Sequence, residues 1–224
     1  MKTKDKKALC IMSGGMDSTL SAYMMRDAGY EIIALHFNYS QLTQKKELEC
    51  FEAICEDLDV KEKYNLDLDF FSKIGASALI DKKIQVPTDG LEEGVPSTYV
   101  PFRNGIFLSI AAAIAEKEGA NVICIGVVEE DSSGYPDCTD YFINSMQNSI
   151  NLGTKDETNL EIKMPLVHLS KSQIVQSSLE LDVPLHLTWS CYKNETKACG
   201  VCDSCRLRLR GFKLAGASDP IAYE

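Results

Sequence analysis

Residues 13–18 of the chain read Ser-Gly-Gly-Met-Asp-Ser, and they stand between a continuous apolar run and a stretch of helix-forming residues. The apolar run, Ala8 to Met12, is typical of a buried strand, and the residues from Asp17 to Ala28 are typical of a helix. Glycines let the backbone turn tightly and aim several N–H groups at one point, where the positive end of the following helix also attracts anions. The sequence therefore predicts a phosphate-binding loop between a first strand and a first helix.

Apolar runs and helical spacing alternate along the rest of the chain. Further strands are expected at residues 31–37, 60–66 and 121–128, and further helices at 45–58, 104–118, 138–152 and 170–181. Apolar strands that alternate with helices indicate an α/β fold, an open parallel sheet with helices on both faces. The proline-rich stretch 82–101 is predicted to be a long loop that carries function.

The size of the chain fits one α/β domain and a small appendage. With 224 residues, 45% of them hydrophobic, it can bury one sizeable core. We expect a nucleotide-binding domain over residues 1–187 and a metal-binding segment over 188–224 packed on it. The net charge of −10 argues against nucleic acid as the main partner. No apolar run is long enough to cross a membrane, so we expect a cytoplasmic protein with no membrane partner.

The C-terminal segment contains four cysteines with the spacing C-x7-C-x2-C-x2-C, at Cys191, Cys199, Cys202 and Cys205. In a reducing compartment such a cluster suggests a metal site and not disulfides. Four thiolates within fifteen residues match a structural zinc site, and an iron–sulfur cluster also takes four thiolates.

Polar residues follow the predicted strands or open the predicted helices at several points. Asp17 can cap the first helix or help to hold magnesium. Arg103 opens a helix, where a guanidinium is better explained by an anionic ligand than by the helix dipole, and Lys171 is placed to offset charge on an attacked phosphate. We expect these three residues to be catalytic, although a surface position is the simpler alternative for Arg103 and Lys171.

A second group of residues is expected to bind the substrate. Tyr39 and Gln41 follow the second strand, where a tyrosine can stack on a base and an amide can bind its edge. An acidic turn near residue 131 has carboxylates that can accept from the N–H groups of a guanine-like base, unless it is an ordinary solvated turn. The expected substrate-binding residues are Tyr39, Gln41, Asn104, Glu129, Asp131, Tyr135 and Asp137.

The loop is not a Walker phosphate loop, because no lysine follows its glycines. Its pattern, S-G-G-x-D-S, resembles the pyrophosphatase-loop ATP enzymes, which cleave between the α- and β-phosphates and form adenylates. This resemblance implies an adenine nucleotide α-hydrolase-like fold. The ATP-binding residues are expected to be Met12, Ser13, Gly14, Gly15, Met16, Asp17, Ser18, Thr19, Leu20, Ser21 and Ala22.

Over nearly its whole length the chain resembles the QueC family of queuosine precursor biosynthesis. The resemblance is carried by the loop 13–18, by Thr-Tyr-Val-Pro-Phe-Arg-Asn at 98–104, by Ser-Gly-Tyr-Pro-Asp-Cys at 133–138 and by the four cysteines. The chain departs from the family pattern at several positions, among them Ser40 and Phe102, where glycine is commoner.

The resemblance implies an ATP-dependent ligase that converts 7-carboxy-7-deazaguanine and ammonia into 7-cyano-7-deazaguanine. The carboxylate attacks the α-phosphate of ATP, ammonia displaces AMP to give an amide, and a second ATP activates the amide so that loss of AMP leaves the nitrile. The same resemblance implies a structural zinc, ATP with magnesium, and a homodimer.

Three alternatives remain at this point. A relative that thiolates a tRNA base would need a basic surface, for which the end of the chain offers Arg206, Arg208, Arg210 and Lys213. Another relative would transfer the activated deazaguanine to a protein amine. A zinc-stapled interaction module would have no enzymatic activity.

Overall fold

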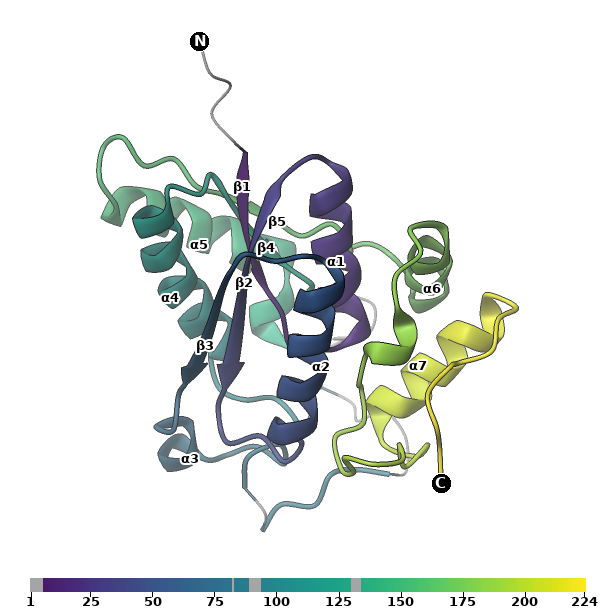
Figure 1. Ribbon diagram of the computed structural model, residues 1–224. Helices are drawn as coiled ribbons and strands as arrows, with labels where there is room; N and C mark the ends of the chain where they lie inside the picture. The colour runs from purple at the N-terminus through teal and green to yellow at the C-terminus, as the bar shows by residue number, and fades with distance from the viewer. Residues whose placement is uncertain (1–5, 82, 89–93, 130–133) are drawn as a thin grey trace.

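The computed structural model describes residues 6–81, 83–88, 94–129 and 134–224 (Figure 1). Within these residues the strands form one five-stranded parallel sheet in the order β3-β2-β1-β4-β5, which confirms the expected fold class. The strands are β1 (Lys7–Ile11), β2 (Glu31–Asn38), β3 (Glu62–Asp67), β4 (Val122–Ile125) and β5 (Glu161–Lys163).

Helices cover both faces of the sheet because the side chains of the central strand alternate between two cores. In β1, Ala8 and Cys10 belong to the core beneath α1 (Met16–Asp27) and α2 (Gln44–Asp57). Leu9 and Ile11 belong to the core beneath α4 (Arg103–Glu118) and α5 (Asp140–Gly153), which lie on the opposite side of the sheet in Figure 1. Both faces are therefore apolar, and this explains the continuous apolar run of β1.

The shorter elements complete the chain. They are α3 (Phe71–Ile74), the 3-10 turns η1 (Pro136–Cys138) and η2 (Leu185–Leu187), and two helices beside α1 and α2, α6 (Lys171–Glu180) and α7 (Asp203–Leu214). None of the described helices combines the length and the apolar character that crossing a bilayer requires.

Two strands differ from the sequence-based expectation. Strand β4 ends at Ile125, short of the predicted residue 128. The chain there passes close to α1, since a Cβ built on Gly126 would lie 2.9 Å from the backbone of Ser18. Strand β5 was not predicted, because three residues give too short a pattern to recognise.

The C-terminal segment is bound to the sheet domain by hydrogen bonds. The backbone N–H of Trp189 donates to the Gly14 carbonyl over 2.9 Å, so the segment contacts the glycine loop directly. Further along, the buried guanidinium of Arg208 donates to the Leu185 carbonyl over 3.1 Å, and within the segment it donates to both carboxylate oxygens of Asp219, over 2.8 and 3.0 Å. These hydrogen bonds hold the residues from Trp189 onward against the glycine loop at the end of β1 and the residues before them.

Strand order also determines where a ligand can bind. The chain leaves β1 toward β2 on one side of the sheet, and it later returns to β4 on the other side of β1. In parallel sheets the crevice at such a reversal, at the carboxyl ends of the strands, is the usual ligand site.

Candidate active site

A cavity of about 260 Å³ lies at the reversal between β1 and β4. Its walls come from the residues that follow β1, β2 and β4, from the first turns of α1, α2 and α4, and from residues 189–192 of the C-terminal segment. Residues from five distant parts of the sequence therefore meet in one space.

The glycine loop forms one wall of the cavity. Gly14 has φ +80°, and a Cβ at this position would lie 2.5 Å from the Glu47 carbonyl oxygen, so only glycine fits. The hydroxyls of Ser13 and Ser18 lie 3.1 Å apart, and the Ser13 N–H donates to the Ser18 hydroxyl. Of the eleven residues expected to bind ATP, six line the cavity: Met12, Ser13, Gly15, Met16, Asp17 and Ser18.

The other five expected ATP-binding residues support the loop from behind. Gly14, Thr19, Leu20, Ser21 and Ala22 are not among the residues that line the cavity. Leu20 and Ala22 are fully buried in the core under α1, and the Thr19 hydroxyl donates to the Gly15 carbonyl over 2.8 Å. These residues thus position the loop from the core side.

Asp17 and Lys171, which are far apart in the sequence, form an ion pair beside the loop. The Lys171 ammonium donates to the two Asp17 carboxylate oxygens over 2.9 and 3.0 Å. Lys171 is the first residue of α6, whose start is fixed by a capping box between Ser170 and Gln173. Asp17 lines the cavity, and the pair therefore brings a cation to the edge of the phosphate loop.

Arg103 lies in the cavity wall at the start of α4, among aromatic rings. Its guanidinium donates to the Tyr39 hydroxyl over 3.2 Å and lies 5.5 Å from the Tyr39 ring centre. Its Nε is buried and has no hydrogen-bond partner among the described residues. Burial raises the pKa of Tyr39 to about 12, so the phenol stays neutral. An anionic ligand would satisfy the free donor of Arg103.

The expected substrate-binding residues are divided between the cavity and its supports. Tyr39, Gln41, Asn104 and Tyr135 line the cavity. Asp137 does not line it; its carboxylate accepts from the Asn104 N–H over 2.9 Å and so caps α4, and burial raises the pKa of this carboxyl. Glu129 accepts from the Asp140 N–H over 3.0 Å and also lies outside the lining. Asp131 falls outside the described residues.

Several residues of the cavity wall were not among the expected site residues. Glu47, in the first turn of α2, places a carboxylate there, and Trp189, Ser190 and Tyr192 line the cavity from the C-terminal segment. Cys138 also lines it and accepts from the Asn104 side-chain amide over 3.2 Å. A signal existed for Cys138, which ends the motif at residues 133–138, and for Tyr192, which directly follows the first cysteine of the cluster.

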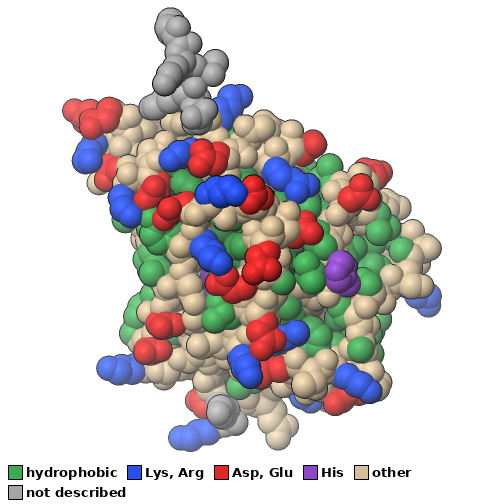
Figure 2. Space-filling model, viewed as in Figure 1, with side chains coloured by type: hydrophobic (Ala, Val, Ile, Leu, Met, Phe, Trp, Pro, Cys, Tyr) green, Lys and Arg blue, Asp and Glu red, His purple; other side chains and the backbone are tan. Residues whose placement is uncertain are grey.

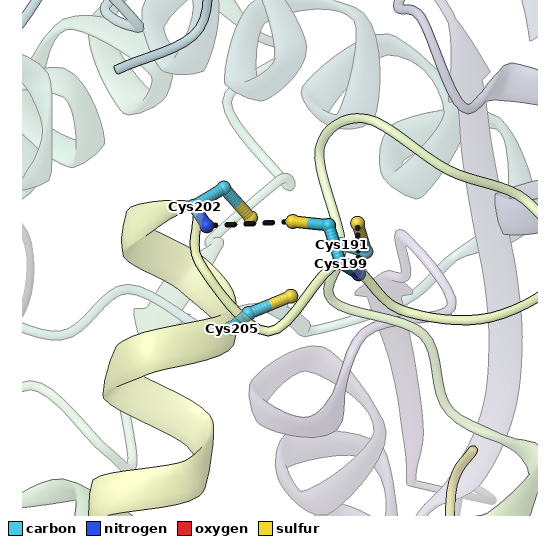
Figure 3. A group of neighbouring side chains, drawn as sticks. All are labelled: Cys191, Cys199, Cys202 and Cys205. Carbon is cyan, nitrogen blue, oxygen red and sulfur yellow. Dashed lines mark hydrogen bonds between the residues drawn. The ribbon is translucent and has the colours of Figure 1, made fainter. Parts of the chain in front are cut away.

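The four C-terminal cysteines gather as their spacing predicts (Figure 3). Their sulfur atoms lie within 4.8 Å of one another, and all four cysteines are free thiols. Thiolates about 2.3 Å from a tetrahedral ion lie about 3.8 Å apart, so a small inward movement would complete the coordination. The Cys191 sulfur accepts from the N–H groups of Lys193, Asn194 and Cys199 over 3.4 Å each, as a thiolate ligand would. The donor set therefore fits a bound metal.

One of the four basic residues near the chain end is buried and paired within the protein. Arg208 is only 1% exposed and is neutralised by Asp219. On the face in Figure 2, Lys and Arg side chains are interspersed with Asp and Glu. Arg208 is therefore unavailable to a nucleic acid, whereas Arg206, Arg210 and Lys213 are exposed.

Comparisons with known proteins agree with this geometry. The family model described as "Queuosine biosynthesis protein QueC" matches residues 7–216. A protein of Sulfurimonas denitrificans named 7-cyano-7-deazaguanine synthase is 74% identical over 223 residues, which cover 100% of both chains. A protein of the same name from a Sulfurovum species is 72% identical and covers 97% of this chain and 98% of its own.

Solved structures extend the comparison to the fold. NMN synthetase from Francisella tularensis superposes with a TM-score of 0.53 over 96% of this chain and 79% of its own. At 17% sequence identity this likeness concerns the fold alone, which is adenine nucleotide α-hydrolase-like.

Proposed function

The chain belongs to the QueC family of queuosine biosynthesis proteins, and we propose that its cavity converts 7-carboxy-7-deazaguanine and ammonia into 7-cyano-7-deazaguanine at the expense of ATP. The observation that carries this proposal is that the phosphate loop and the Arg103 guanidinium line the same cavity. A nucleotide phosphate and a substrate carboxylate can therefore be held side by side, as adenylation requires.

The loop 13–18 would bind the leaving pyrophosphate. Its glycines permit the turn, and the N-terminal N–H groups of α1 point to the anion. Magnesium, which accompanies ATP, would offset the polyphosphate charge, and Asp17 is the carboxylate next to the loop that would hold it. Lys171 would offset the charge that grows on the α-phosphate during attack, while Asp17 keeps its ammonium in place.

The reaction has two rounds, and in each an oxygen of the substrate attacks the α-phosphorus of one ATP. In the first round a carboxylate oxygen, oriented by Arg103, bonds to the α-phosphorus, and the bond to the β-phosphate breaks. Ammonia then attacks the acyl carbon, loses a proton and expels AMP, which leaves an amide. In the second round the amide oxygen attacks the α-phosphorus of another ATP, and pyrophosphate leaves again. Loss of two N–H protons and of AMP then gives the nitrile.

The remaining proposals concern the bound metal, the oligomeric state, the cellular location and the domain division of the protein. The cysteine cluster would hold a structural zinc, and its ligands are Cys191, Cys199, Cys202 and Cys205. We further propose a homodimer in the cytoplasm, with a nucleotide-binding domain over residues 1–187 and a zinc-binding segment over 188–224. The free thiols and the N–H donors to Cys191 support the metal, and an iron–sulfur cluster is the alternative that elemental analysis would detect.

Incubation of the pure protein with ATP, magnesium, ammonium and 7-carboxy-7-deazaguanine tests the function, with the nitrile detected by mass. Asp17→Ala and Arg103→Ala should lose turnover while they remain folded. The matched controls are Asp27→Ala at the other end of α1 and Arg210→Ala, both at exposed positions. Wild-type rates in both site variants would contradict the site, and a wild-type protein that makes only the amide would contradict nitrile formation.

A further inference from the structure

Glu47 is a carboxylate in the cavity wall that the proposed reaction does not use. Among the described residues that line the cavity, Asp17 and Glu47 are the acidic ones. Asp17 is paired with Lys171, whereas Glu47 forms no ion pair with a described residue. Glu47 is half-buried, and a carboxylate held partly away from water without a cation is unfavourable, so hydrogen bonds from a ligand would stabilise it.

The hydrogen bonds of Glu47 leave room for such a ligand. One carboxylate oxygen accepts from the Gln41 side-chain amide over 3.0 Å, and the other accepts from the Thr43 hydroxyl over 2.7 Å. An ionised carboxylate has about four acceptor positions. These two donors therefore fix the orientation of the group and leave about two acceptor positions for N–H groups of a ligand.

A chain of hydrogen bonds connects Glu47 with Arg103 along one wall of the cavity. Arg103 donates to the Tyr39 hydroxyl, the Tyr39 N–H donates to the Gln41 side-chain oxygen, and the Gln41 amide donates to Glu47. One end of this wall is a cation that can only donate, and the other end is an anion that can only accept. Tyr39 and Phe107 provide aromatic surface between them.

The deazaguanine substrate has the complementary polarity. Its 7-carboxylate lies at one end of a planar bicyclic ring, and the adjacent N1–H and 2-amino donors lie at the opposite end. The adenine of ATP has no such pair of neighbouring donors, because its N1 is an acceptor. A carboxylate therefore distinguishes the guanine-type base from the nucleotide that shares the cavity.

We propose that Glu47 accepts hydrogen bonds from the N1–H and 2-amino group of the base and makes the enzyme specific for guanine-type substrates. This inference rests on the proposed function, since it assigns Arg103 to the carboxylate at the other end of the same molecule. It adds an acceptor to those expected in the acidic turn near residue 131, of which Glu129 lies outside the cavity lining.

The test compares Glu47→Gln with wild type on 7-carboxy-7-deazaguanine and on the analogue that lacks the 2-amino group. Loss of hydrogen bonds to a charged acceptor should reduce kcat/KM for the guanine-type substrate roughly 10- to 100-fold, mainly through KM. The kcat/KM for the analogue should decrease less, so that the ratio of kcat/KM between the two substrates becomes smaller in the variant. The KM for ATP should stay within about twofold of wild type, as expected for a residue that does not bind the nucleotide. Glu49→Gln, two residues along the same helix with a side chain 53% exposed, is the control.

Each other outcome would overturn the inference. A matched loss for both substrates would mean that Glu47 does not bind the 2-amino group, and a raised KM for ATP would place Glu47 in the nucleotide site. A raised KM for ammonium alone would make Glu47 an ammonium-binding residue. Calorimetry of wild type and Glu47→Gln with the base alone, without ATP, measures the affinity for the base even if no nitrile forms. Failure of the Glu47 inference can therefore be told apart from failure of the proposed function.

Discussion

The ammonium group of Lys171 lies between the two carboxylate oxygens of Asp17, at 2.9 and 3.0 Å. This ion pair connects the first turn of α6 with the first turn of α1. The stem of Lys171 packs on α7, where a Cβ built on Gly211 would lie 2.5 Å from the Lys171 Cγ. The position of the ammonium group beside the phosphate loop therefore depends on a glycine in the C-terminal segment.

Gly211→Ala should impair turnover without unfolding the protein. Alanine normally stabilises a helix interior by up to about 1 kcal/mol relative to glycine, but here its methyl group would displace Lys171. Misplacement of a catalytic group by about 1 Å can reduce the rate about 100-fold, so we expect a decrease of roughly 10- to 100-fold in kcat. Steady-state kinetics and a thermal melt measure the two effects.

Gly153→Ala is the matched control for this variant, because nothing lies within 4 Å of a Cβ at that helical glycine. It should keep wild-type kcat. If Gly211→Ala behaved in the same way, the position of Lys171 would not depend on α7.

Glu47→Gln should stabilise the protein at neutral pH while it weakens substrate binding. Burial raises the pKa of Glu47 in the folded protein, although hydrogen bonds from Thr43 and Gln41 and the charge of Arg103 oppose the shift. A raised folded-state pKa contributes stability that is complete below the unfolded-state pKa and is lost as the pH rises through the folded-state pKa. Glutamine stays neutral at all pH values, so the stability of the variant relative to wild type should increase as the pH rises.

Thermal midpoints at pH 4 and pH 8 check this sign. The difference between Glu47→Gln and wild type should be larger at pH 8. An equal difference at both values would mean that Glu47 is not destabilised by its burial, and Glu49→Gln again serves as the control.

Removal of the metal should disturb the cavity as well as the C-terminal segment. Cys205→Ser should lose the metal, of which we expect about one zinc per chain in the wild type. Trp189, Ser190 and Tyr192 lie next to the cluster and line the cavity, so ATP affinity should decrease together with the thermal midpoint. Elemental analysis and nucleotide titration measure the two quantities.

Cys55→Ala is the control for the metal experiment, since Cys55 is a buried thiol on α2 and lies outside the cluster. It should keep its zinc and its affinity for ATP. Iron in the wild type would refute the zinc proposal, and unchanged nucleotide affinity in metal-free Cys205→Ser would show that the cavity does not depend on the cluster.

Arg208→Met should be strongly destabilising. The change leaves the Asp219 carboxylate, only 4% exposed, without its cation. Breaking a buried pair costs about 3–5 kcal/mol, which lowers the thermal midpoint by roughly 6–20 °C for a chain of this size. Arg208→Met combined with Asp219→Leu should recover part of the loss in calorimetry, because no buried charge then remains. A single variant as stable as wild type would contradict the structural role of the pair.

The sequence predicted the features that local patterns determine. The glycine loop was recognisable because strand, turn and helix follow one another without interruption, and the cysteine cluster because its four members lie within fifteen residues. The parallel sheet followed from apolar runs such as β1, whose side chains face two cores. In each case neighbouring residues carry the whole signal.

Features that depend on contacts between distant segments were not predictable in the same way. Glu47 lies in a run of charged residues, Lys-Lys-Glu-Leu-Glu, which resembles a solvated helix face, and only the fold turns it into the cavity. Asp137 was expected to bind the substrate because it lies near the acidic turn, yet its carboxylate caps α4. The structure also explains why glycine is commoner at two positions where this chain departs from the family pattern, since Ser40 (φ 66°) and Phe102 (φ 54°) adopt the left-handed conformation that favours glycine.

The hydrogen bond from Trp189 to Gly14 connects the first loop of the chain to one of its last segments. During synthesis on the ribosome, the residues of the phosphate loop emerge long before the segment that holds them. The sheet can begin to assemble earlier, as N-terminal parts of a nascent chain do. The nucleotide site, however, is complete only after residue 189 has been translated, so a prematurely terminated chain would have the loop but not a finished site.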